Sequence, residues 1–162
     1  MQHIMTDWEQ QIDWAKLRKF RVERMVTVMK QKGIRAVLLA KLDTIRYATS
    51  FHSVQTWMFH GNRHIAIVTD EGHVSLLAAS GDVKRVQNTM PWLTDVEPFP
   101  FLMTEGYPVL EKKMKELGIT KGKVGIDMMA FDITRKLRLG FPDIDFVEGG
   151  CVVEEAQLVK AP

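Results

Sequence analysis

The sequence is poor in cysteine, with Cys151 as the single thiol among 162 residues. One thiol cannot form an internal disulfide, so the fold must rely on its hydrophobic core, as is typical of proteins in a reducing compartment. No apolar run approaches the roughly 18 residues that span a bilayer. The N-terminal stretch MQHIMTDWEQ carries acidic residues and lacks the apolar segment of a secretory signal. We therefore expect a cytoplasmic protein with no membrane partner.

The sequence also lacks an excess of charge of one sign. Lys and Arg number 22 and Asp and Glu number 20, which gives a formal net charge of +2. Nucleic-acid-binding domains commonly carry a strong basic excess, and their affinity falls steeply with salt. The basic residues of the first predicted helix are interrupted by Glu23 and favour a solvated helix face. These residues are Lys16, Arg18, Lys19, Arg21 and Arg24. We therefore expect no nucleic-acid partner.

Motifs for phosphate binding and nucleophilic catalysis are missing as well. The Gly149-Gly150 pair is followed by no Lys-Ser/Thr, so the chain has no glycine-rich phosphate cradle. No GxSxG elbow is present, and Cys151 has no histidine near it in the sequence. A helix N-terminus would lower the pKa of the Cys151 thiol, but a small packing residue is the simpler interpretation. The chain thus shows no catalytic set of its own.

Histidines gather in the stretch RYATSFHSVQTWMFHGNRHIAIV, which runs from Arg46 to Val68 and contains His52, His60 and His64. His60 and His64 are four residues apart, a spacing that brings two rings together only on a helix. Gly61-Asn62 lies between them, a strand is expected to begin at His64, and no HExxH pattern is present. Polar residues that line a surface or interface are therefore favoured over a metal site. We expect no metal ligand and no catalytic residue in the chain.

The composition, with 46% hydrophobic and 26% charged residues, is that of a globular chain that can bury a core. Hydrophobic periodicity, caps and turn residues predict alternating helices and strands. Helices are expected at 13–32, 43–47, 80–91, from about 104 or 108 to 117, at 129–140 and 152–160, and strands at 34–40, 64–70, 73–79, 95–99, 123–127 and 144–149. This order predicts one α/β domain, residues 1–162, with a three-layer architecture of a mixed sheet and helices on both faces.

With the elements placed, the stretch FRVERMVTVMKQKGIRAVLLAKLDTIRYATSF resembles the opening of creatinase, prolidase and Xaa-Pro aminopeptidase, members of the M24 peptidase family. Thr44 stands where the family usually has Asn, and Ser50 where it usually has Gly. The resemblance continues through NRHIAIVTDEG and KVGID. It ends with FPDIDFVEGGCVVEEAQLVKAP, which is similar to the link into the family's catalytic domain. The resemblance extends from about residue 15 to the end of the chain.

The resemblance implies the N-terminal domain of an M24-type metal-dependent hydrolase, with a fold related to the ribonuclease H-like motif. The family's catalytic domain has the pita-bread fold and holds a divalent metal pair through two Asp, one His and two Glu. None of those ligand motifs appears here, and the chain stops at Pro162, where that domain would begin. We therefore expect no cofactor in this chain. The segment YATSFHSVQTWMFHGNRHI also resembles a subgroup that includes dimethylsulfoniopropionate lyases.

The resemblance further implies a homodimer, in which this domain reaches over the catalytic cleft of the partner subunit. In creatinase a Phe and an Arg ahead of the second strand meet the substrate, and Phe59 and Arg63 match them with a spacing two residues longer. Arg63 offers a planar donor fork for a carboxylate of a peptide or other small substrate. Trp57 would cover an apolar or cationic group, and His60 would donate a hydrogen bond. Trp57 and Phe59 are equally suited to anchoring the core or an interface.

A second interpretation is a stand-alone protein-binding or scaffold module of the same fold that lacks catalysis. A coding sequence that continues beyond Pro162 into Asp, Asp, His, Glu and Glu ligands would favour the hydrolase, whereas a natural stop codon there would favour the module.

Because the chain lacks a catalytic set, the 162-residue protein alone should not hydrolyse Xaa-Pro dipeptides and should bind no stoichiometric metal. Peptidase assays with added Mn²⁺, together with metal analysis after dialysis, check this. Turnover by the pure chain would contradict it.

Overall fold

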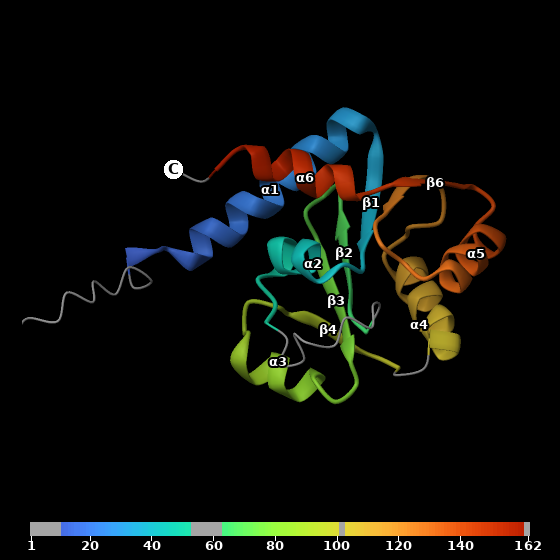
Figure 1. Ribbon diagram of the computed structural model, residues 1–162, viewed down its shortest axis with the longest axis horizontal. Helices are drawn as coiled ribbons and strands as arrows, with labels where there is room; N and C mark the ends of the chain where they lie inside the picture. The colour runs from blue at the N-terminus through green and yellow to red at the C-terminus, as the bar shows by residue number, and fades with distance from the viewer. Residues whose placement is uncertain (1–10, 53–62, 101–102, 161–162) are drawn as a thin grey trace, which may run out of the picture.

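The computed structural model describes residues 11–52, 63–100 and 103–160 (Figure 1). Its helices are α1 (Trp14–Lys32), α2 (Leu42–Thr49), α3 (Val83–Thr89), α4 (Met103–Glu116), α5 (Phe131–Gly140) and α6 (Gly150–Leu158). Its strands are β1 (Ile34–Leu39), β2 (Ile65–Thr69), β3 (Val74–Ala79), β4 (Asp95–Phe99), β5 (Gly122–Ile126) and β6 (Ile144–Glu148). Every predicted element is present. None of the helices described is both long and apolar enough to cross a bilayer.

The strands form one sheet in the order β4-β3-β2-β1-β5-β6, in which β2 runs antiparallel to both of its neighbours. The remaining contacts, β1 with β5, β5 with β6 and β3 with β4, are parallel. Strands β2 and β3 form a hairpin, and Gly72 in its turn has a φ of 88°. One edge of the sheet, here called the carboxyl edge, therefore contains the ends of the parallel strands and the beginning of β2.

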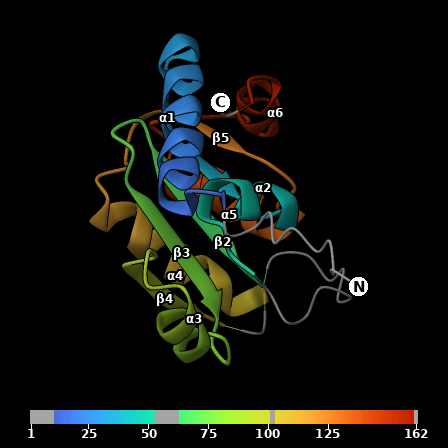
Figure 2. The same cartoon turned by 90° about the vertical axis from the view of Figure 1, so that its left-hand side faces the viewer.

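Helices cover both faces of the sheet, as the alternation of helices and strands predicts (Figure 2). Side chains of β1 alternate between two buried clusters, because successive residues of a strand point to opposite faces. Val37 and Leu39 pack with residues of α1, α2 and α6, whereas Ala36 and Leu38 pack with residues of α4 and α5. The mixed sheet with two helical layers confirms the predicted three-layer fold.

Helix α1 begins and ends where its caps place it. The Asp13 carboxylate accepts a hydrogen bond from the backbone N–H of Lys16 at 2.9 Å, and Gly33 closes the helix with a φ of 66°. Met25 is fully buried, whereas Trp14, at the start of the helix, remains 42% exposed. The first turns of α1 project away from the sheet (Figure 1).

On the outer side of each edge strand, one backbone hydrogen-bonding group is either missing or already bonded. Pro98 in β4 has no backbone N–H, and β4 is an edge strand as the sequence predicts. The Lys113 ammonium of α4 lies 2.6 Å from a carboxylate oxygen of Asp95 and 2.6 Å from one of Glu97, which attaches α4 to β4. On the opposite edge, Arg138 donates to the β6 carbonyl of Phe146 at 3.2 Å.

Helix α2 begins at Leu42, one residue before its predicted start, and the residues just ahead of it are held by a side chain at the end of a distant strand. Asp127, directly after β5, accepts hydrogen bonds from the backbone N–H groups of Ala40, at 2.6 Å, and Lys41, and from the Thr44 hydroxyl. Burial raises the pKa of the Asp127 carboxyl, although these hydrogen bonds oppose that change. The contact joins the ends of β1 and β5 to the start of α2.

Gly149 lies where β6 passes into α6, and its backbone touches the end of β5. Its N–H donates to the carbonyl of Ile126 at 2.8 Å. A Cβ atom at Gly149 would lie 2.7 Å from the carbonyl carbon of Gly125, and a Cβ atom at Gly125 would lie 2.8 Å from the Cα of Gly149. The two glycines thus allow two backbone segments to approach more closely than side chains permit.

Gly149→Ala should lower the free energy of unfolding by about 1 to 3 kcal/mol, because the added methyl group meets backbone atoms that cannot rotate away. Gly81→Ala is the matched control, since a Cβ atom there meets nothing within 4 Å and Gly81 has no positive φ. Urea denaturation of the two variants and the parent chain measures the difference. Equal stabilities of the two variants would show that the close approach does not constrain the fold.

Candidate functional site at the start of β2

Arg63 lies at the carboxyl edge, two residues before β2, and is half-buried. It is the one predicted site residue that the structure places. Trp57, Phe59 and His60 lie outside the described residues, so their predicted roles stay predictions.

His64, next to Arg63, is buried and fixed by the neighbouring strand. Its Nδ1 accepts the backbone N–H of Ala79 at 3.1 Å, so in the neutral ring Nε2 carries the proton. Its ring centroid lies 4.6 Å from that of Phe51. Burial lowers the pKa of His64 to about 4, the Asp82 carboxylate opposes this change, and the guanidinium groups of Arg85 and Arg63 add to it. His64 is therefore neutral at pH 7.

A charge pair on α3 completes the surroundings of His64. Asp82 lies 3.8 Å from Nε2 of His64 and 2.9 Å from Nε of Arg85. Arg85 also donates to the backbone carbonyl of His52 at 2.7 Å. We refer to these residues together as the β2-start cluster, which comprises Phe51, His52, Arg63, His64, Asp82 and Arg85. Through it, the chain on each side of residues 53–62 is attached to the rest of the domain.

The chemistry available to the β2-start cluster is binding rather than covalent catalysis. It contains no serine, cysteine or lysine, and its buried histidine cannot act as an acid near pH 7 because that ring is already neutral. Asp82 compensates the charge of Arg85 at 2.9 Å. The cluster thus orients Arg85, and Arg63 lies at the same edge of the sheet, where ligands of open α/β sheets commonly bind.

The cluster does not fit a metal site. Nδ1 of His64 is occupied by the Ala79 N–H, and the His64 ring is buried against Phe51. His60, the middle member of the histidine trio, lies outside the described residues. Within residues 11–52, 63–100 and 103–160, no group of three or more His, Cys, Asp or Glu side chains could hold a metal ion.

A second polar cluster at the opposite edge of the sheet contains a serine, a histidine and an aspartate. His73 Nε2 lies 2.8 Å from Oδ2 of Asp95 and 3.0 Å from the Ser75 hydroxyl, which also donates to Asp95. Burial would raise the pKa of Asp95, but hydrogen bonds from Lys113, Ser75 and His73 hold it below its ordinary value. A catalytic triad uses two different nitrogens of the histidine, so this cluster joins β3, β4 and α4 without forming one.

Cys151 lies at the start of α6, where its backbone N–H donates to the Glu148 carboxylate at 3.0 Å. Burial raises the pKa of its thiol, and the hydrogen bond to Glu148 adds to this increase. The thiol is therefore less reactive than an ordinary cysteine, which agrees with the interpretation of Cys151 as a packing residue.

Sequence reasoning missed Asp82, Arg85 and Phe51. No local pattern marks them, because their contacts with His64 and His52 arise only when α3 folds against the carboxyl edge.

His64 makes folding dependent on pH. The unfolded ring has a pKa of 6.5 and the folded ring a pKa of about 4, so the unfolded chain binds the proton more readily between these values. The stabilisation is complete above pH 6.5 and should fall by about 3 kcal/mol as the pH approaches 4.

In His64→Gln the loss of stability between pH 7.5 and 4.5 should be about 2 kcal/mol smaller than in the parent chain. His52→Gln, which changes an exposed histidine of the same cluster, should leave that loss unaltered. Urea denaturation at the two pH values tests this. A His64→Gln variant with the parent's pH dependence would show that His64 binds its proton equally well in the folded and the unfolded chain.

Comparison with known proteins places this geometry in a family. The model of the creatinase/prolidase N-terminal domain matches residues 21–159. A comparison with curated protein sequences gave no match. The solved structures that resemble the chain include peptidases of bacteria and archaea, described next.

An Xaa-Pro dipeptidase from Bacillus anthracis is 16% identical over 89% of this chain and 37% of its own length, with a TM-score of 0.66. A dipeptidase from Pyrococcus horikoshii is 22% identical over 87% of this chain and 37% of its own, with a TM-score of 0.65. The N-terminal domain of the cytoplasmic peptidase PepQ from Mycobacterium tuberculosis is 18% identical, covers 84% of this chain and 97% of its own, and has a TM-score of 0.63.

The chain thus spans 37% of the first two peptidases and 97% of a separate N-terminal domain. At these identities the structural likeness establishes the fold, and the family match rests on the sequence over residues 21–159. The protein belongs to the creatinase/prolidase N-terminal domain family.

Proposed function

We propose that this domain caps the active site of an M24-type metal-dependent hydrolase and takes part in its dimerisation. The observation that supports this most directly is the position of Arg63, at the carboxyl edge and beside a buried neutral histidine. In this role Arg63 binds substrate in the catalytic cleft of a partner subunit. The chemistry belongs to a metal pair in the catalytic domain.

The surroundings of Arg63 suit a residue that binds an anion. His64 is neutral at pH 7, so it does not compete with Arg63 for a negatively charged group. The Ala79 N–H fixes the ring of His64, the residue after Arg63. On the other side of residues 53–62, Arg85 donates a hydrogen bond to the carbonyl of His52. Anchors on both sides reduce the entropy lost when the intervening segment contacts a ligand.

The substrate class follows from the guanidinium group. A planar fork of donors matches the two oxygens of a carboxylate, which every peptide carries at its C-terminus. Xaa-Pro dipeptidases are among the proteins that share this fold. A short peptide with a free carboxylate is therefore the substrate that we propose for the complete enzyme, and Trp57, Phe59 and His60 would complete the contact surface.

The test requires a form of the protein that includes a catalytic domain. Arg63→Gln should raise KM for an Xaa-Pro dipeptide about 10- to 100-fold, because a charge-assisted hydrogen bond to the carboxylate is lost. Metal content should stay unchanged, and Arg63→Lys should restore part of the affinity. Arg35→Gln, an exposed arginine on β1 outside the cluster, is the matched control.

An unaltered KM in Arg63→Gln would overturn the capping role, and a monomer in light scattering would overturn the role in dimerisation. The same preparation should be offered dimethylsulfoniopropionate, because the resemblance also includes the lyase subgroup. Cleavage of that compound without peptidase activity would show that the complete protein is a lyase and not a hydrolase.

A further inference from the structure

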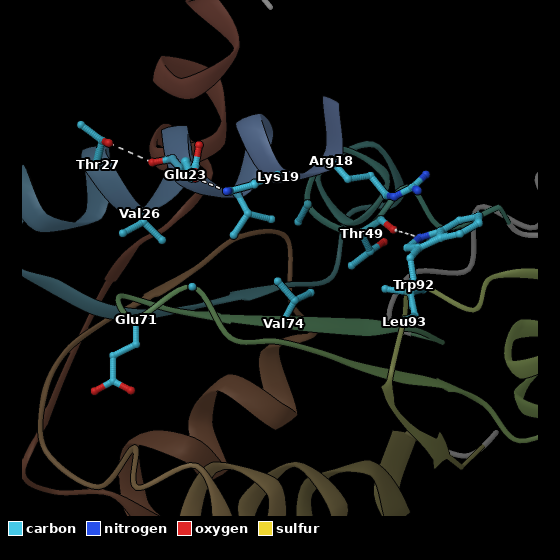
Figure 3. A pocket seen from close by; sticks show the side chains of 13 residues that line it. Arg18, Lys19, Glu23, Val26, Thr27, Thr49, Glu71, Val74, Trp92 and Leu93 are labelled. Carbon is cyan, nitrogen blue, oxygen red and sulfur yellow. Dashed lines mark hydrogen bonds and ion pairs between the residues drawn. The ribbon is translucent and has the colours of Figure 1, made fainter. Parts of the chain in front are cut away.

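A groove of about 570 Å³ runs along α1 on the face of the sheet that α1 covers (Figure 3). One side is a stripe of α1 from Arg18 to Thr27, and the other side is formed by the start of β3 and by Trp92-Leu93 ahead of β4. The volume lies within the range of about 300 to 1,000 Å³ that is common for small-molecule sites. The groove shares no residue with the β2-start cluster.

The middle of the groove is apolar. Val26 projects from α1, and Val74 of β3 points toward α1 from the sheet (Figure 3). Val22 of α1 also lines the groove. Ala48 and Leu93 are buried beside these three side chains, which are only partly covered. The free energy falls when an apolar ligand displaces water from partly covered valines in a concave site.

At one end of the groove, the positively charged side chain of Arg18 is held in place. The guanidinium carbon of Arg18 lies 4.3 Å from the centroid of the Trp92 ring, and the indole N–H of Trp92 donates to the carbonyl of Thr49 at 2.9 Å. A guanidinium group that packs its face on an aromatic ring keeps in-plane N–H donors for an anion. Arg18, one of the residues predicted to form a solvated basic face, therefore also packs on an aromatic ring.

No acidic side chain neutralises this end within the described part of the chain. Arg18 has no carboxylate within ion-pair distance among those residues, and the Lys19 ammonium lies 3.8 Å from the Glu23 carboxylate, with both side chains largely exposed. Glu71 lines the groove, but its carboxylate points away from it (Figure 3). An exposed pair at this distance compensates charge only weakly, so the Arg18 end is positive.

We propose that the groove binds an anionic amphiphile, a carboxylate joined to an unbranched apolar chain. The carboxylate contacts Arg18, and the chain lies on Val22, Val26 and Val74. The distance along α1 from Arg18 to Thr27 is about 13 Å, which suits an extended chain of roughly ten carbons. The complementarity of charge at one end and of apolar surface along the rest determines this class of ligand.

The probes for the test are decanoate and decyltrimethylammonium, which share a chain and differ in the sign of the head group. Both are titrated into the 162-residue chain below their micellar concentrations and are followed by calorimetry and by ¹H–¹⁵N NMR. Decanoate should bind saturably and shift the indole N–H signal of Trp92 and the amide signals of Val22 and Val74. Decyltrimethylammonium should bind at least tenfold more weakly.

Variants then separate the two parts of the site. Arg18→Gln should weaken decanoate about tenfold through loss of a charge-assisted hydrogen bond. Lys30→Gln removes a charge from α1 outside the groove and should change affinity less than twofold. Val74→Thr keeps the branched shape suited to a strand but adds a hydroxyl to the floor, and it should weaken decanoate several-fold even if Arg18→Gln fails to fold.

Several results would overturn the proposal. Equal affinity for the two probes, unchanged affinity in Arg18→Gln, or NMR shifts that do not concentrate in the groove would each exclude it. Binding that appears only after deletion of residues 1–10 would show that the chain's own N-terminus occupies the groove. A dimer that dissociates in Arg18→Gln would assign it to a second copy of the chain.

Discussion

The antiparallel insertion of β2 into an otherwise parallel sheet is the constraint on which the rest of the structure depends. A parallel β2 would start at the opposite edge, whereas the antiparallel strand starts beside the ends of β1 and β3. Arg63 and His64 thereby lie at the carboxyl edge, where β1 connects to α2 and β3 connects to α3. The same reversal makes the β2–β3 connection a short hairpin. The groove lies between α1 and the start of β3.

Two backbone contacts give the carboxyl edge its rigidity. Asp127 joins the end of β5 to the start of α2 through two backbone N–H groups and a hydroxyl, and Gly149 brings the end of β6 against β5. Neither contact can shift without leaving buried polar groups unpaired or forcing backbone atoms together. The β2-start cluster is therefore built next to a framework that moves little, which is the usual requirement for a residue that must meet a ligand in a defined orientation.

Much of the fold could be predicted from the sequence because its signals are local. Asp13 and Gly33 act on the residues next to them, and the apolar runs of β1 and β2 are continuous. The contacts that sequence reasoning missed join distant segments. Asp127 accepts hydrogen bonds from Ala40 and Lys41, and Arg18 packs on Trp92. Arg63 was found through resemblance, whereas Asp82 and Arg85 were missed, because their contacts with His64 and His52 join separate segments and leave no periodic trace.

The two outer strands have a consequence for how the domain can associate with other chains. Pro98 removes one hydrogen-bond donor from β4, and Arg138 occupies the carbonyl of Phe146 in β6. Neither border therefore offers the uninterrupted ladder that templates an intermolecular β-sheet. Pairing with another chain along either outer strand is therefore disfavoured.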